Sequence, residues 1–186
     1  MIVVVCPGQG SQTPGFLEPW IADPGSKALL ETLSAAADVD LVKHGTVSDA
    51  DTIRDTAIAQ PLIVAAGILT LDALAETDHL AKTSGIAGHS VGEFTAAAGA
   101  GVLDATDAVR LVGIRGRAMA DAAALVPTGM SAVIGGEESD IIAKLDELGL
   151  FPANYNGGGQ LVVAGELPAL AKLADEPPAG TRVIPL

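Results

Sequence analysis

Residues 88–92 read Gly-His-Ser-Val-Gly, so that a glycine lies two positions before and two positions after Ser90. This spacing is typical of a nucleophile elbow, a tight turn from a strand into a helix that lifts the serine hydroxyl above the edge of a sheet. The short segment before Ser90 reads as a strand and the segment after it as a helix rich in small residues. The N–H groups and the dipole at the start of that helix could stabilise an oxyanion. The pattern therefore predicts a serine nucleophile, with an ordinary glycine-rich turn as the alternative.

A second glycine-containing loop, Gly8-Gln9-Gly10, follows the strand expected at 2–6. It does not match the dinucleotide-binding pattern GxGxxG, because Thr13 occupies the third glycine position. Two glycines let the backbone come close to an acyl oxygen, and a loop after another strand commonly supplies the second oxyanion donor of such a site. The N–H groups of Gln9 and Val91 are therefore predicted to form an oxyanion hole.

Arg115 lies in a helix expected over 105–125. A turn of about 100° per residue places Arg115 on the apolar stripe of this helix and puts Arg110 and Arg117 on the opposite, solvated side. A buried guanidinium needs an acidic partner or a cavity. Two interpretations remain open, an internal salt bridge and a clamp that binds a substrate carboxylate in bidentate fashion. The other members of the predicted stripe are Ala108, Leu111, Val112, Met119 and Ala122.

None of the three histidines is well placed as a base for Ser90. His89 is its neighbour, and adjacent side chains on a tight turn point in different directions, so His89 is predicted to line the pocket. His44 and His79 lie in polar stretches that indicate surface loops or helix ends. No histidine follows position 89, whereas elbow-serine hydrolases place their basic histidine after the serine.

The composition narrows the function classes. A chain of 186 residues, 49% of them hydrophobic, can form one domain, or a domain with a smaller one inserted. A formal net charge of -13 disfavours nucleic acid and anionic membrane surfaces as partners. Cys6 is the single cysteine, which excludes an internal disulfide, and the apolar run at 61–71 is shorter than the roughly 20 residues that span a bilayer. We expect a cytoplasmic protein whose partners are small molecules and other proteins, with no membrane contact.

The predicted elements fall into two parts that meet near residue 128. The first part, 1–127, contains a strand buried on both faces, the elbow, and a long core helix that is entered or kinked at Pro61. The second part, 128–186, has the order βαββαβ, which is typical of a small ferredoxin-like unit, with a hairpin turn at 157–159. The elements expected in that part are strands at 130–135, 151–156, 160–165 and 182–186 and helices at 138–148 and 167–175.

Several motifs together resemble the malonyl-CoA:acyl carrier protein transacylases and the related acyltransferases of polyketide synthases. Their order and spacing match along the whole chain. They are PGQGSQ at 7–12, GHSVGE at 88–93, Arg115-Gly116 with Met119, Gly129-Met130, and NYNGGGQLVVAG at 154–165. The resemblance implies the α/β class, with an α/β-hydrolase-like large domain into which a ferredoxin-like small domain is inserted.

The resemblance also implies roles for individual residues. Ser90 would carry the malonyl group as an ester, the Gln9 and Val91 N–H groups would form the oxyanion hole, and Arg115 would hold the malonyl carboxylate. Met119 and His89 would belong to the substrate site, and Asn154 or Asn156 is a further candidate to face the cleft. The reaction would be ping-pong, from coenzyme A to the serine and then to the phosphopantetheine thiol of acyl carrier protein. We expect this reaction to need no cofactor and no metal.

The chain departs from the family at its end. Family members have a catalytic histidine in a Gly-Ala-Phe-His motif shortly after the strand that ends here as RVIPL. We therefore expect an N-terminal portion with an incomplete large domain, an exposed sheet edge and exposed apolar surface. Two alternatives to the transacylase remain, an elbow-serine esterase or thioesterase and a catalytically inactive fragment. A carboxylate clamp at Arg115 would distinguish the transacylase from a hydrolase.

Overall fold

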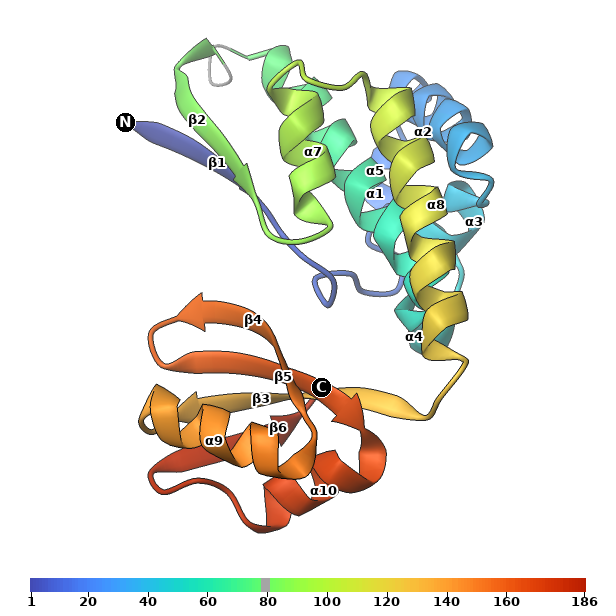
Figure 1. The fold of residues 1–186 in the computed structure, drawn as a ribbon. Coiled ribbons are helices and arrows are strands. Elements are labelled where there is room, and N and C mark those ends of the chain that lie inside the picture. The colour runs from blue at the N-terminus through green and yellow to red at the C-terminus, as the bar shows by residue number, and fades with distance from the viewer. Residues whose placement is uncertain (78–80) are drawn as a thin grey trace. The chain divides into compact units, whose positions relative to one another are not determined.

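The computed structural model describes residues 1–77 and 81–186 (Figure 1). His79, expected in a surface loop or at a helix end, lies outside these described residues. The chain divides into two compact units, Met1–Asp121 and Ala122–Leu186. This division lies six residues before the expected junction at 127/128 (127 minus 121). Both units combine helices with a sheet, so the chain has α/β content as expected.

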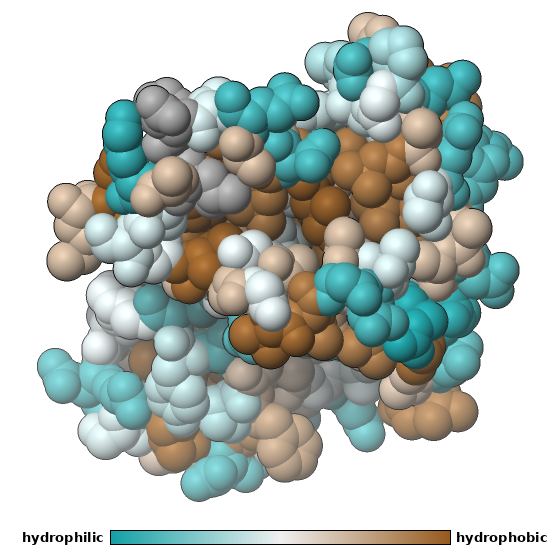
Figure 2. Space-filling view, turned by 90° about the horizontal axis from the view of Figure 1, so that it is seen from above, coloured by the Kyte–Doolittle hydropathy of each residue, from teal (hydrophilic) through white to brown (hydrophobic). Residues whose placement is uncertain are grey.

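The sheet of the first unit consists of two parallel strands, β1 (Ile2–Cys6) and β2 (Thr83–Gly88). Cys6 pairs with Gly88, so both strands end at the same edge. The prediction that β1 is buried on both faces is wrong, because the side chain of Val5 is 72% exposed. Within the described residues β1 pairs with β2 alone, and helix α7 packs on these strands. Apolar side chains also reach the surface in the space-filling view (Figure 2).

Seven helices of the described residues begin in the first unit. Aspartates are the N-cap residues of several of these helices. The side chains of Asp23, Asp40 and Asp49 each accept a hydrogen bond from a backbone N–H in the first turn of the helix that follows. These N–H groups hold the pKa of Asp23 and of Asp49 below the ordinary value. The helices are α1 (Glu18–Ile21), α2 (Pro24–Ala37), α3 (Leu41–Thr46), α4 (Ala50–Arg54), α5 (Thr56–Ala75), α7 (Gly92–Gly99) and α8 (Ala105–Ala123).

Helix α5 forms the centre of the first core. The structure divides the expected long helix into α4 and α5. Asp55 is the N-cap residue of α5, because its side chain accepts a hydrogen bond from the Ala57 N–H. Pro61 lies inside α5 rather than at its entry. Among the described residues α5 is the one helix whose length and composition would suit a membrane span, which is weak evidence because a buried core helix has the same features. Leu62, Val64 and other residues of α5 are fully buried against the neighbouring helices.

The second unit is a four-stranded antiparallel sheet with two helices. Its strand order is β4-β5-β3-β6, and the predicted βαββαβ element order is confirmed. The helices share an apolar cluster with the sheet that includes Val133, Leu145 and Leu173. Gly158 and Gly159 both have positive φ between the paired residues Gly157 and Gln160, which confirms the predicted hairpin turn. The elements are β3 (Thr128–Gly135), α9 (Glu138–Leu148), β4 (Phe151–Gly157), β5 (Gln160–Glu166), α10 (Leu167–Asp175) and β6 (Thr181–Pro185).

Candidate active site

Ser90 lies on the predicted sharp turn between β2 and α7. Its φ of 52° is in the left-handed region, which a non-glycine residue adopts only where the surrounding structure holds it there. The flanking glycines make the turn possible. A side chain at Gly88 would collide with the backbone of Gly92, and one at Gly92 would collide with the carbonyl oxygen of Cys6 at the end of β1. The Ser90 side chain is consequently exposed at the carboxyl edge of the two strands.

The loop after β1 lies beside this turn. The His89 N–H donates to the Cys6 carbonyl oxygen at 3.0 Å, and a Cβ on Gly8 would lie 2.7 Å from His89 Nδ1. Gln9 is held by its side chain, whose Nε2 donates to Thr56 Oγ1 at 3.3 Å. Within the described part of the chain, the backbone N–H groups of Gln9 and Val91 donate no hydrogen bond to another group of the protein. Neither donor has a hydrogen-bond acceptor within the described residues, although Val91 itself is fully buried. Their joint action as an oxyanion hole stays a prediction.

Arg115 lies directly at the serine. Its Nη2 donates to Ser90 Oγ at 3.2 Å and its Nη1 donates to Gln60 Oε1 at 2.6 Å. The side chain is half-buried, and it forms no ion pair with any carboxylate of the described residues. Of the two interpretations of this arginine, the internal salt bridge is thus wrong for the described part of the chain. A guanidinium with neutral partners keeps its full charge available for an anion.

Two glycines of helix α8 face the backbone of neighbouring helices. A Cβ on Gly116 would lie 2.9 Å from the Thr56 carbonyl oxygen of α5, and one on Gly113 would lie 2.7 Å from the Ala37 carbonyl oxygen of α2. The predicted apolar stripe is accordingly wrong in part, since glycines rather than large apolar residues fill the contact. The exposed members of that stripe are Leu111, Met119 and Ala122, and the buried residues of α8 are Ala108, Val109, Val112, Gly113 and Gly116.

Arg117 also differs from its expected place on a solvated face. Its Nη1 donates to the Ala37 carbonyl oxygen at 2.8 Å, at the end of α2. That carbonyl belongs to the last turn of the helix, where a cation is favoured by the helix dipole. Arg110 does lie on the surface as expected, in an ion pair with Asp107. Among the three arginines of α8, Arg115 alone contacts the candidate nucleophile.

Gln60, a residue of α5 that is only 1% exposed, was not predicted as a site residue from the sequence. Its Oε1 accepts the hydrogen bond from Arg115, and its Nε2 lies 3.2 Å from Met119 Sδ. Met119, one of the predicted substrate-site residues, therefore contacts the same side-chain amide as Arg115. The available signal was a single glutamine in a helix that is otherwise nearly all apolar, because a polar side chain in such a helix must have a buried partner.

Cys6 offers a possible second nucleophile close to the turn, at the end of β1. The side chain is 4% exposed, and burial raises the pKa of its thiol. A thiolate is the reactive form of cysteine, and a buried, protonated thiol is inert. The exposed Ser90 hydroxyl is therefore the better candidate for the nucleophile of the site.

The remaining predicted residues lie elsewhere. His44 is in the last turn of α3, and its Nδ1 is 3.0 Å from Ser48 Oγ, which agrees with a helix end. Asn154 and Asn156 belong to β4 of the second unit, where the Asn156 side chain donates to Gln160 Oε1 at 2.8 Å. Arg115 is the one hydrogen-bond partner of Ser90 Oγ within the described residues.

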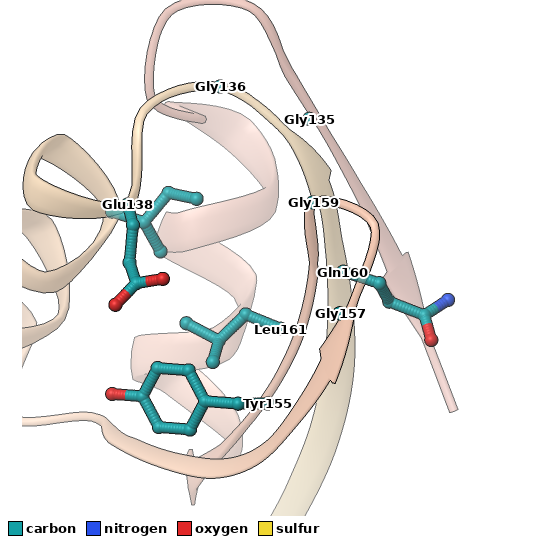
Figure 3. Close-up of a pocket in the computed structure, with 9 residues that line it drawn as sticks. Gly135, Gly136, Glu138, Tyr155, Gly157, Gly159, Gln160 and Leu161 are labelled. Atoms are coloured by element: carbon teal, nitrogen blue, oxygen red, sulfur yellow. The ribbon is translucent and has the colours of Figure 1, made fainter.

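A pocket of about 120 Å³ in the second unit is a less suitable site. Figure 3 shows the Glu138 carboxylate and the Tyr155 ring on one side of the strands and Gln160 pointing away from them. The volume of this pocket is well below the roughly 300 Å³ at which the volumes of small-molecule sites begin. The other lining residues are Gly135, Gly136, Ile141, Gly157, Gly159 and Leu161. The group around Ser90 is the stronger candidate because it joins an exposed nucleophile to a cation.

The Acyl transferase domain family matches residues 3–183, and the chain belongs to this family. It is 53% identical over 184 residues to the malonyl CoA-acyl carrier protein transacylase of Mycobacterium tuberculosis. The alignment covers 98% of this chain and 61% of that protein. The chain thus spans about three fifths of the length of the curated relatives it matches.

Solved structures agree with this membership. The crystal structure of MCAT from Mycobacterium tuberculosis superposes with a TM-score of 0.95 at 52% identity, over 100% of this chain and 62% of that one. A second structure contains a type II polyketide synthase acyl-carrier protein in complex with its malonyl-transacylase. It has a TM-score of 0.85 at 30% identity, again over 100% of this chain and 62% of the solved one.

Proposed function

We propose that this chain carries the malonyl-accepting site of a transfer from malonyl-coenzyme A to the phosphopantetheine thiol of acyl carrier protein. The observation that carries the proposal is the Arg115 guanidinium, which contacts Ser90 Oγ at 3.2 Å and has no carboxylate partner among the described residues. An acyl group on Ser90 would bring its own carboxylate to this cation. The names of the relatives, which are malonyl CoA-acyl carrier protein transacylases, support the same substrates. Fatty acid or polyketide synthesis is the pathway we propose, and the solved complex of a malonyl-transacylase with a type II polyketide synthase acyl-carrier protein supports the second of these.

In the proposed first step, Ser90 Oγ attacks the thioester carbonyl carbon. A carbon–oxygen bond forms, the carbon–sulfur bond breaks, and coenzyme A leaves as a thiol after taking up the proton that the serine loses. The N–H groups of Gln9 and Val91 would receive the negative charge of the tetrahedral intermediate, while Arg115 holds the carboxylate and Met119 and His89 line the acyl site. In the second step the carrier thiol attacks the ester carbonyl carbon, so that a carbon–sulfur bond forms, the carbon–oxygen bond to Ser90 breaks, and the serine oxygen takes up the proton that the thiol loses. Neither step needs a metal or a cofactor.

The same family membership supports a finer description of the fold. The parallel pair β1–β2 leading into the serine turn supports an α/β-hydrolase-like domain, of which 1–127 would be the first part. The antiparallel order β4-β5-β3-β6 with both helices on one apolar cluster supports a ferredoxin-like domain at 128–186. A cytoplasmic location would suit soluble thioester and carrier substrates.

A second candidate function follows from the hydrogen-bond partner of the Ser90 hydroxyl. Its hydroxyl contacts an arginine and no histidine within the described residues, so the 186 residues alone would transfer malonyl groups slowly or not at all. Loss of the base of a serine triad costs on the order of 10³-fold or more in rate. The chain would then act as an inactive part of the transacylase.

Intact mass spectrometry separates these candidates. The chain is incubated with malonyl-coenzyme A, and Ser90→Ala is the matched control because it removes only the hydroxyl. A malonyl adduct on the unmutated chain and none on Ser90→Ala would support the acyl-serine step. Absence of any adduct on a folded sample over many hours would leave the inactive fragment as the answer. Acyl transfer to water as fast as to a carrier thiol would indicate a thioesterase.

A further inference from the structure

We propose that Gln60 is a positioning residue that sets the acyl-group selectivity of Ser90, because it orients the Arg115 guanidinium through an uncharged acceptor. The inference rests on the proposed function, since it names the group on which the carboxylate clamp depends. Gln60 lies in α5 and Arg115 in α8, 55 positions apart in the chain, and the 2.6 Å hydrogen bond between their side chains joins the two helices.

The Gln60 amide can face Arg115 in one orientation only. A guanidinium carries donors and no acceptor, so the amide oxygen must point toward it and the NH₂ group away from it. The NH₂ group lies 3.2 Å from Met119 Sδ, a weak acceptor. An amide turned round would set two donors against each other inside the core, at the cost of a buried unsatisfied group. The two contacts therefore fix the amide and, through it, the plane of the guanidinium.

The neutrality of residue 60 matters as much as its position. An amide oxygen accepts an N–H and leaves the charge of Arg115 uncompensated, whereas a carboxylate at the same position would form a buried ion pair with it. Such an internal pair would compete with any substrate carboxylate for the same guanidinium. The glutamine thus orients the cation and keeps it free to bind an anion.

The guanidinium is held between the core and the nucleophile. Nη1 binds Gln60 and Nη2 binds Ser90, so an arginine that loses its Gln60 partner would be free to rotate away from the serine. Side-chain rotation would weaken carboxylate binding without changing the surface that binds a neutral acyl group. The expected consequence is a selective loss for malonyl over acetyl thioesters.

The test measures binding of malonyl-coenzyme A and acetyl-coenzyme A by calorimetry in the Ser90→Ala protein, which cannot become acylated. Gln60→Met keeps the side-chain volume and removes the acceptor, and Gln60→Glu supplies the competing carboxylate. Thr95→Val is the matched control, because Thr95 is similarly buried at 2% exposure and is not among the hydrogen-bond partners of Arg115 in the described part of the chain. Thermal unfolding by circular dichroism shows that each variant is folded.

We expect Gln60→Met to reduce the malonyl preference by roughly 10-fold or more, as a lost hydrogen bond to a charged group does. Gln60→Glu should abolish the preference, and Thr95→Val should leave it unchanged. In ¹⁵N NMR spectra the Arg115 guanidinium of Gln60→Met should rotate faster about its Cζ–Nε bond, a change that a merely structural role would not produce.

The outcomes separate the two proposals. If the parent protein prefers malonyl-coenzyme A and both Gln60 variants retain the full preference, the inference about Gln60 is overturned while the proposed function stands. If the parent protein itself shows no preference, the proposed clamp function is overturned, and the inference that rests on it is overturned with it.

Discussion

Gly116→Ala tests whether the close contact between α8 and α5 positions Arg115. The added Cβ would lie 2.9 Å from the Thr56 carbonyl oxygen and 3.2 Å from Ala57 Cα, both backbone atoms that cannot rotate away. Ordinary van der Waals contact begins at 3.4 Å, so α8 must move by about 0.5 Å (3.4 minus 2.9). Arg115 is the preceding residue and moves with the helix, which strains a hydrogen bond of 2.6 Å to Gln60.

The magnitude follows from two opposing terms. Overpacking at a rigid contact costs about 1–3 kcal/mol, and alanine gains about 1 kcal/mol over glycine in a helix interior. We expect a net destabilisation of roughly 0–2 kcal/mol by urea unfolding, together with a loss of malonyl preference of about 10-fold or more because hydrogen bonds depend steeply on geometry.

Ala118→Gly is the matched control for this prediction. Ala118 is exposed in the same helix, so its replacement should cost about 1 kcal/mol of stability without moving Arg115. A Gly116→Ala protein that keeps the full malonyl preference would refute the claim that the glycine contact sets the arginine. Loss of preference in Ala118→Gly would show that any destabilisation of α8 has the same effect.

Three further predictions concern the turn, the helix starts and the thiol. Gly92→Ala should destabilise the first unit by about 1–3 kcal/mol and remove acylation of Ser90, because the new Cβ would meet the Cys6 carbonyl oxygen and lie 2.6 Å from that of Pro7; a urea-unfolding curve equal to that of the parent would contradict this. The capping N–H groups lower the pKa values of Asp23, Asp49 and Asp104 in the folded state, so their stabilisation is present above the unfolded pKa of about 3.9 and is lost as the pH falls through the lowered folded values. Unfolding free energies measured from pH 6 to pH 2 should decline, and less so in the Asp49→Asn protein. Burial raises the pKa of Cys6, so alkylation at pH 8 should be slow in the folded protein and fast in urea, and equal rates would place the thiol at the surface.

The sequence predicted the serine turn well because the turn is local. Two glycines at fixed spacing, a strand before them and a helix after them are sufficient to define it, and the φ of 52° at Ser90 follows from that geometry. The same holds for the hairpin at 157–159, where positive φ values require glycine. Arg115 was found for a related reason, because a charge close to the buried side of an amphipathic helix is visible in the helix alone.

The sequence could not predict the contacts between distant segments. Gln60 and Arg115 belong to different helices that meet at Gly116, and the periodicity of either helix says nothing about the other. Apolar periodicity also does not count glycine as a buried residue. The predicted stripe of α8 therefore included residues that are exposed, such as Met119. The predicted burial of β1 failed because it depends on which elements cover the strand, as the 72% exposure of Val5 shows.

A competition of two acyl groups for Ser90 tests the carboxylate clamp directly. The chain and its Arg115→Ala variant are each incubated with equal concentrations of malonyl- and acetyl-coenzyme A, and intact mass gives the ratio of the two acyl groups on the protein. An uncompensated guanidinium 3.2 Å from Ser90 Oγ predicts mostly malonyl on the parent chain, and loss of that preference with slow acetylation retained in Arg115→Ala. Equal acetyl and malonyl loading of the parent chain would contradict a carboxylate clamp at Arg115.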